Sequence, residues 1–151
     1  WYTYIMTLNE LIEQAKIDMK FDDTELDRES LRIPQLHNKY LNFYHEEKLR
    51  YQGYKTNYSK MFKLKWENYC GKLSEDQLKE LGWEPFDLKI LRQDVDIYLD
   101  ADKDLIELKN KMSIQEEKVD YLNSVIKGIT NRQFHIRDAI TWRKFLNGSI
   151  W

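Results

Sequence analysis

The sequence predicts a mainly α-helical protein in which long helices are joined by a less regular middle segment. Only five glycines and two prolines interrupt 151 residues, too few for the many turns of a β-sandwich. Ten tyrosines and five tryptophans need a core, a subunit interface or a stacking surface to cover them. The broad aromatic stripe favours a chain that packs with copies of itself, and the alternative is a monomeric antiparallel hairpin of the two long helices.

The first helix is expected from Thr7 to about Lys20. Thr7 and Glu10 have the spacing of a capping box, and an amphipathic stripe of leucines and an isoleucine follows them. Residues 1–5, which precede Met6, are interpreted as an upstream or non-native extension. We expect residues 1–151 to form a single domain, and this helix is its first element.

A much longer helix is predicted next. Asp22 or Asp23 is expected to cap it, Pro34 to kink it, and Tyr69 to end it just before Gly71. On a helical wheel its tyrosines and phenylalanines fall within one broad arc. This helix completes an N-terminal helical region, 6–71.

The segment 72–99 is predicted to be a connector. Ser74 and Gln77 have capping-box spacing and start a short helix that stops near Gly82. Beyond it the alternation in 84–99 favours short extended pieces, with helix as the alternative.

The last part of the chain, 100–148, is predicted to form another long helix. Asp100 is expected to cap it and Gly128 to interrupt it, with Thr130 or Asn131 restarting it. Asn147-Gly148 has the composition of a helix C-cap.

The sequence does not match the residue patterns of common catalytic and metal-binding sites, so we do not expect an enzyme. If Asp100, Asp102 and Asp104 opened a calcium loop, Leu105 would stand where glycine is needed and Lys111 where a bidentate glutamate is needed. Acids at a helix start are explained by capping and by the helix dipole. No metal site is therefore predicted.

The remaining reactive residues are equally unpromising as a site. The histidines His37, His45 and His135 have no zinc spacing, and Cys70 has no second cysteine to join it. A lone cysteine also excludes an intrachain disulfide and suits a reducing cytosol. The five glycines are isolated, so no phosphate-binding loop is expected, and neither is a cofactor. No apolar run is long enough for a membrane span, and no signal peptide is visible.

The sharpest signal is local charge. Residues 48–72 carry seven basic residues and one acid, Glu67, in a chain whose net charge is −2. On the helical wheel four of the lysines fall together along one border of the aromatic arc, whereas Lys65 points nearer the apolar stripe. Single-stranded nucleic acid is held by such cationic faces with aromatic rings on which bases stack. The predicted nucleic-acid-binding residues are Lys48, Lys55, Lys60, Lys63, Lys65, Lys72, Trp66 and Tyr69.

Two other interpretations of this face stay open. It can be a hydrated basic face beside core aromatics, with no ligand at all. A membrane surface is a weaker third option, because the apolar stripe is mostly tyrosine and the rest of the chain is acidic.

Four segments, in order along the chain, carry a resemblance to a known family. They are "FDDTEL", "KLKWENYCG", "LDADKDLIEL" and "NRQFHIRDAITWRKFLNG". Together they resemble the UvsY family, the recombination mediator proteins of tailed phages.

This resemblance implies a small helical protein without catalytic activity that binds single-stranded DNA and forms a ring-like homo-oligomer, a hexamer or heptamer. It also implies two protein partners, a RecA-like recombinase and a single-strand-binding protein, in the cytoplasm of an infected bacterial host. The mediator would help to load the recombinase onto DNA covered by the single-strand-binding protein. The family's basic pair falls on Lys63 and Lys65, with lysine at a position where the family can have arginine, so a bidentate phosphate contact is lost there.

The resemblance also implies that the C-terminal helix is the main assembly element. The expected oligomerisation residues are the apolar side chains Leu105, Leu108, Met112, Val119, Leu122, Ile126, Phe134 and Ile140. The alternative function is a helical coiled-coil or adaptor protein that forms the same oligomer without touching nucleic acid.

Overall fold

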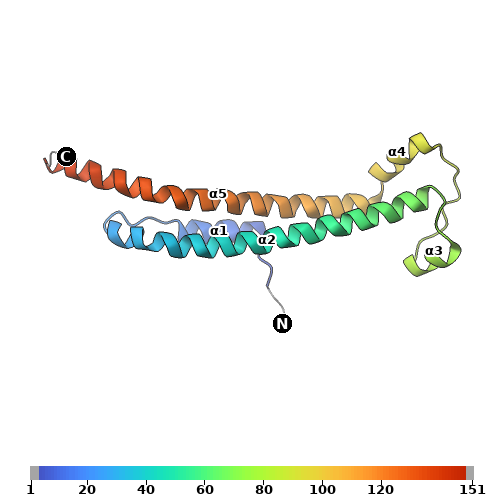
Figure 1. The fold of residues 1–151 in the computed structure, drawn as a ribbon, viewed down its shortest axis with the longest axis horizontal. Helices are drawn as coiled ribbons and strands as arrows, with labels where there is room; N and C mark the ends of the chain where they lie inside the picture. The colour runs from blue at the N-terminus through green and yellow to red at the C-terminus, as the bar shows by residue number, and fades with distance from the viewer. Residues whose placement is uncertain (1–3, 149–151) are drawn as a thin grey trace. The chain divides into compact units, whose positions relative to one another are not determined.

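The computed structural model describes residues 4–148, which form five α-helices and one 3-10 turn (Figure 1). The mainly α-helical class is therefore confirmed. Residues 1–3 of the expected extension 1–5 lie outside the described part, and Tyr4 and Ile5 have no regular structure. The elements are α1 Leu8–Asp18, α2 Leu26–Tyr69, α3 Glu75–Leu81, η1 Arg92–Asp94, α4 Val95–Asp100 and α5 Lys103–Leu146.

The chain divides into two compact units. Unit 1 contains the residues up to 49 together with those from 115 onward, and unit 2 is Arg50–Ile114. The long helices α2 and α5 each contribute one part to each unit. The predicted partition of a single domain into 6–71, 72–99 and 100–148 follows the helices and stays a prediction.

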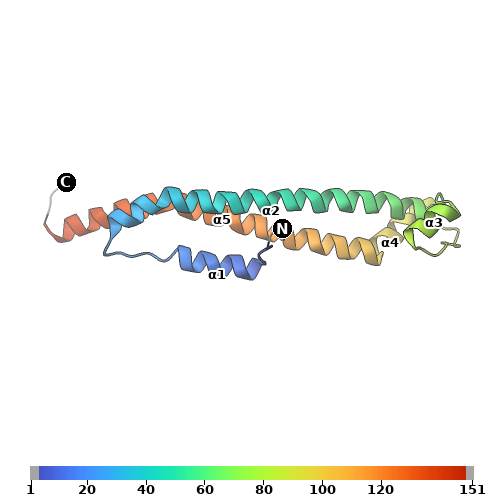
Figure 2. The same ribbon diagram turned by 90° about the horizontal axis from the view of Figure 1, so that it is seen from below.

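Unit 1 is built around α1, which lies along the parts of α2 and α5 that belong to this unit (Figure 2). The capping box predicted at Thr7 and Glu10 is present, since each residue's side chain accepts a hydrogen bond from the other's backbone N–H. The core contains one face of each of the three helices: Leu11, Ala15, Leu36, Tyr40, Leu122 and Ile129.

Buried ion pairs accompany this core. Glu29 on α2 and Arg132 on α5 are both about 5% exposed, with 2.6 Å between the carboxylate oxygen and the guanidinium nitrogen. Gln115 donates to the carboxylate of Glu47 at 2.5 Å, and Lys118 lies 3.7 Å from that carboxylate. Buried charges need such partners because an unpaired one costs several kcal/mol.

Unit 2 has a second core at the end of α2. Val95, Leu99 and Leu105 pack there against partly buried aromatic and aliphatic side chains of α2, including Trp66 and Tyr69. The predicted short helix is confirmed as α3, with a capping box between Ser74 and Gln77 and with Gly82 in the left-handed region at its end.

The prediction of extended pieces in 84–99 was wrong for its second half. Residues 92–100 form η1 and α4 instead. Val95 and Leu99 are one helical turn apart and both buried, whereas Ile97 is 65% exposed. Val95 and Leu99 are at positions i and i+4, which share one face of a helix. Ile97 lies between them on the exposed side, and it made the three residues look like the alternation of a strand.

Three predicted helix boundaries are also corrected. Asp22 accepts hydrogen bonds from Thr24 in a local turn, and α2 begins only at Leu26. Asp100 ends α4, and Asp102 caps α5 by accepting from the backbone N–H of Leu105 at 3.0 Å. Gly128 does not interrupt α5, since a single glycine costs a helix only about 1 kcal/mol. The expected end of α5 is confirmed, because Gly148 has a φ of 74°.

Within residues 4–148, no helix has the length and apolar character that a bilayer span requires.

Candidate nucleic-acid interface

An exposed row of lysines runs along one face of α2 in unit 2. Lys55, Lys60 and Lys63 are exposed, and they line a shallow depression with three neutral polar residues, Gln52, Thr56 and Ser59. Steps of three and four residues keep all six side chains on one face of the helix. We call Lys55, Lys60 and Lys63 the lysine row.

The lysine row has little acid beside it. Its one described ion pair joins Lys63 to Glu67 at 3.8 Å, and the Lys63 side chain is 77% exposed. Exposed pairs of this kind contribute about 0–1 kcal/mol, so phosphate oxygens can compete with Glu67 for the ammonium group. The Gln52 amide and the Ser59 hydroxyl can add donors for phosphate, whereas the Thr56 hydroxyl already donates to the backbone carbonyl of Gln52 at 3.0 Å.

Lys65 lies away from the row, as the helical wheel predicted. Its ammonium nitrogen is 2.7 Å from Asp104 and 3.3 Å from Asp102, and it sits 4.2 Å from the centre of the Trp83 ring. The side chain is only 9% exposed. The DNA contact expected of Lys65 stays a prediction, while in this structure its donors are used to join α2 to the start of α5.

Tyr69 belongs to the same buried cluster. Its hydroxyl donates to Asp102 at 2.6 Å, and its ring packs edge-on against Phe86 at 5.0 Å. Burial, and then the bond to Asp102, raises the pKa of the Tyr69 phenol. For Asp102, burial alone would raise the pKa, but hydrogen bonds from Tyr69, the Leu105 backbone and Lys65 outweigh it, so the pKa lies below its usual value.

Trp66 is half-buried and packs against the core of unit 2. The ammonium group of Lys72 lies 4.2 Å from the centre of its ring. Stacking of a base on Trp66 or Tyr69 stays a prediction, and both rings already have packing partners within the chain.

Lys48 belongs to unit 1, where it is exposed and lies 5.4 Å from the centre of the Tyr44 ring. Lys72 follows the end of α2 and is also exposed. Neither is part of the depression formed by the lysine row.

The predicted oligomerisation residues divide by burial. Leu105 and Leu122 are almost fully buried within their own units. Phe134 and Ile140 are 43% and 40% exposed. The other four, which are Leu108, Met112, Val119 and Ile126, are partly buried.

Sequence reasoning missed two residues of the exposed apolar surface of α5. The rings of Trp142 and Phe145 stack on one another at 5.5 Å and are 60% and 69% exposed. With Asp138 and Thr141 they line an apolar depression. Their spacing of three residues at the end of an amphipathic pattern was the available signal.

Within residues 4–148, no group of three or more histidine, cysteine, aspartate or glutamate side chains is placed to hold a metal ion. Asp102 and Asp104, considered above as calcium ligands, instead bind Lys65.

Long helices and an exposed cationic face are the features expected of the class of helical nucleic-acid-binding proteins. The family model described as "Recombination, repair and ssDNA binding protein UvsY" matches residues 14–149, and the chain belongs to this family. It is therefore a non-enzymatic recombination mediator of the single-stranded-DNA-binding UvsY type.

A phage protein is similar to this chain in both sequence and fold. The recombination protein uvsY of Enterobacteria phage T4 is 24% identical over 143 residues, which cover 95% of this chain and 99% of the relative. Two crystal structures of the bacteriophage T4 recombination mediator protein UvsY share the fold. The lattice type IV structure has a TM-score of 0.82 and 23% identity, covering 93% of this chain and 99% of that one. The lattice type II structure has a TM-score of 0.83 and 22% identity, covering 95% and 99%.

Proposed function

We propose that the protein holds single-stranded DNA through the lysine row on α2. The observation that carries this proposal is the exposure of Lys55, Lys60 and Lys63 on one helix face whose only described ion pair is the long one to Glu67. Lysines spaced along a helix can neutralise successive phosphates and release their counterions. Lys48 and Lys72 are exposed cations that can add to the same electrostatic attraction.

The action on DNA is that of a mediator. The protein grips several stretches of one strand, which weakens the hold of a single-strand-binding protein and presents the strand to a RecA-like recombinase. The T4 protein of the same fold is itself a recombination mediator protein, which supports this activity for the present chain. Its place of action would be the cytoplasm of the infected bacterial host.

In a homo-oligomer, a weak DNA-binding site on each chain would be enough for tight binding of the strand. A ring of six or seven subunits presents as many lysine rows, and binding of one raises the effective concentration of the strand at the next. The exposed apolar side chains Phe134, Ile140, Trp142 and Phe145 on α5 are the surface that we assign to assembly. Large aromatic side chains at such exposure commonly mark an interface.

The test is fluorescence anisotropy of a labelled oligo-dT strand across a salt series. The variant K55A/K60A/K63A is compared with the control K79A/K109A/K127A, which removes the same charge from exposed lysines elsewhere. We expect tight, salt-sensitive binding by the wild type, a loss of about tenfold or more in the row variant, and little change in the control. Light scattering checks that all three have the same oligomer size.

Equal losses in the row variant and its control would overturn the lysine row as the site, since only total charge would then matter. Absence of binding by the wild type at low salt would favour the alternative, an assembly or adaptor protein with no direct nucleic-acid role.

A further inference from the structure

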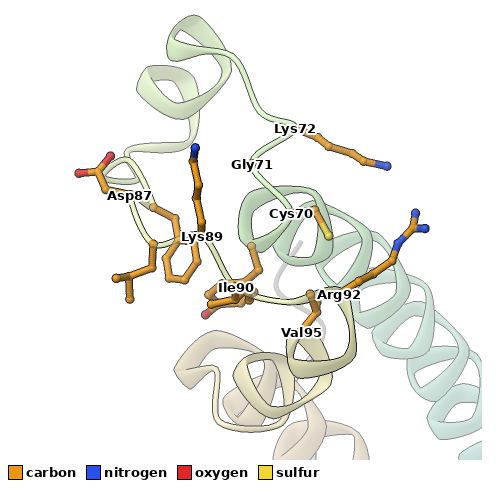
Figure 3. Close-up of a pocket in the computed structure, with 11 residues that line it drawn as sticks. Cys70, Gly71, Lys72, Asp87, Lys89, Ile90, Arg92 and Val95 are labelled. Carbon is orange, nitrogen blue, oxygen red and sulfur yellow. The ribbon is translucent and has the colours of Figure 1, made fainter.

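Unit 2 contains a groove that the lysine row does not include. It lies between the end of α2 and the connector, has a volume of about 540 Å³, and is lined by Tyr69, Cys70, Lys72, Phe86, Lys89 and Arg92, among others (Figure 3). Pockets for small organic ligands typically measure about 300–1,000 Å³, so one nucleotide fits this volume.

Three cations without a described carboxylate partner give the groove its charge, and one of them, Lys72, also lies over the Trp66 ring. Lys72, Lys89 and Arg92 are exposed and form no ion pair with any described carboxylate, and Asp87 is the one acid in the lining. Figure 3 shows Lys72 and Arg92 extending toward the same side of the groove, with Asp87 far from both. Two cations on one side, one of them an arginine that can bind in a bidentate way, suit a phosphate group.

Another part of the lining of the groove is apolar and aromatic, and we call it the Phe86 wall. Phe86 packs edge-on against Tyr69 at 5.0 Å and against Tyr98 at 5.6 Å, and all three rings are only partly buried. Ile90 and Val95 complete the apolar part of the lining. A groove lined by both apolar or aromatic side chains and cations matches a ligand that joins a flat ring to a phosphate.

Both features lie on the same unit as the lysine row. Cys70 in the lining of the groove follows Lys63 by seven residues, which is about two helical turns, so it lies about 10 Å further along the helix on nearly the same face as the lysine row. A strand bound along the row can therefore continue to the groove.

We propose that this groove is a nucleotide-binding subsite for the single strand, with a phosphate between Lys72 and Arg92 and the base against the Phe86 wall. The proposal rests on the proposed function and adds Lys89 and Arg92, which sequence reasoning did not select. An acidic peptide would use the cations but leave the aromatic wall without a role, so we favour nucleic acid.

Cys70 provides a probe that the chain already carries. It is the only cysteine of the protein, it is partly exposed, and it lines the groove. In Figure 3 its sulfur lies on the side where Lys72 and Arg92 extend. A bound nucleotide should therefore slow the alkylation of this thiol.

The experiment measures the rate of Cys70 alkylation by iodoacetamide with and without saturating oligo-dT at low salt. The variant K89A/R92A is compared with K79A/K109A, which removes the same charge from unit 2 outside the groove. We expect oligo-dT to slow alkylation about tenfold in the wild type and the control, and not in K89A/R92A, even when anisotropy shows that the strand is bound. An abasic strand should protect Cys70 less than oligo-dT does. Circular dichroism checks that each variant is folded.

The two proposals fail in different ways. If the wild type binds oligo-dT and K55A/K60A/K63A does not, but the strand leaves the alkylation rate unchanged, the groove proposal is overturned and the lysine row survives. If the wild type binds no strand, the proposed function fails first. Protection by poly-glutamate but not by oligo-dT would overturn the nucleotide subsite in favour of an acidic protein segment.

Discussion

Two stretches of α2 use the same kind of residue for opposite purposes. In 55–63 the lysines are exposed and almost free of acids, whereas at 65–70 the lysine is buried among carboxylates and rings. Lys63 and Lys65 are two residues apart, yet their side chains are 77% and 9% exposed. A helix turns by about 200° over two residues, so the two ammonium groups face opposite sides.

The comparison has a consequence for any basic-x-basic segment on a helix. One partner on one side of the helix meets only one of the two cations. Loss of DNA binding on changing both residues would therefore combine the loss of a contact with damage to unit 2, and single substitutions are needed to separate the two.

The largest expected effect is on the buried side. Replacing Lys65 with methionine leaves Asp102 without its cation in a buried site and should lower the free energy of unfolding by about 3 kcal/mol. Lys63→Met should change it by less than about 0.5 kcal/mol. Urea unfolding followed by circular dichroism measures both, and equal losses would remove the distinction between the two stretches.

The next largest effect is on the salt dependence of DNA binding, and it tests the exposed lysine row. If Lys55, Lys60 and Lys63 each neutralise a phosphate, K55A/K60A/K63A should make the slope of log K against log salt shallower by about two, at roughly 0.7 per contact. Between about 50 and 200 mM salt, the wild type should therefore lose about 1.7 kcal/mol more binding free energy than the variant does. Anisotropy titrations give the slope, and an unchanged slope would show that the row does not contact phosphates.

A smaller effect is expected for the hydroxyl of Tyr69. Tyr69→Phe removes the hydrogen bond to Asp102 and should cost about 1 kcal/mol of stability. The affinity for oligo-dT should change by less than about twofold, since the aromatic ring is retained. Denaturation and anisotropy on the same preparation test both expectations, and a larger change in affinity than in stability would give the hydroxyl a direct role in binding.

The smallest effect concerns acid. The pKa of Asp102 is lower in the folded chain than its usual value, so the folded state binds this proton less readily than the unfolded state. The resulting stability is fully present above about pH 4 and is lost as the pH falls through the lowered pKa. Asp102→Asn should therefore flatten the fall in unfolding midpoint below about pH 4. A fall as steep as in the wild type would assign acid sensitivity to other carboxylates.

Local signals in the sequence predicted most of the fold. The capping boxes at Thr7 and Ser74 are complete within four residues, and Gly82 ends α3 as its position indicates. The helical wheel also separated Lys65 from the lysine row. These features depend on neighbours within about one helical turn, which the sequence displays directly.

The features that the sequence did not show depend on contacts between residues that are far apart along the chain. The carboxylates that hold Lys65 come from the start of α5, and the groove is completed by the connector. The apolar residues around Val95 and Leu99 have the spacing of a strand, and only their packing against side chains of α2 shows that they form a helix. Lys89 and Arg92 lie in the connector, whose apolar alternation says nothing about its distance from Lys72, and only the tertiary structure brings the three cations to one groove.

The spacing of the long-range hydrogen bonds also bears on the order of folding. Tyr69 and Asp102 in unit 2 are 33 residues apart, whereas Glu47 and Gln115 are 68 apart and Glu29 and Arg132 are 103 apart in unit 1. Closing a shorter loop costs less conformational entropy, so the contact in unit 2 should form before the other two. The bonds that Asp18 on α1 accepts from Arg32, Lys39 and Tyr40 on α2 span only 14 to 22 residues and can form earlier still. During synthesis, however, Glu29 must wait for Arg132 to leave the ribosome, so this buried ion pair is expected to be among the last native contacts that the N-terminal segment acquires.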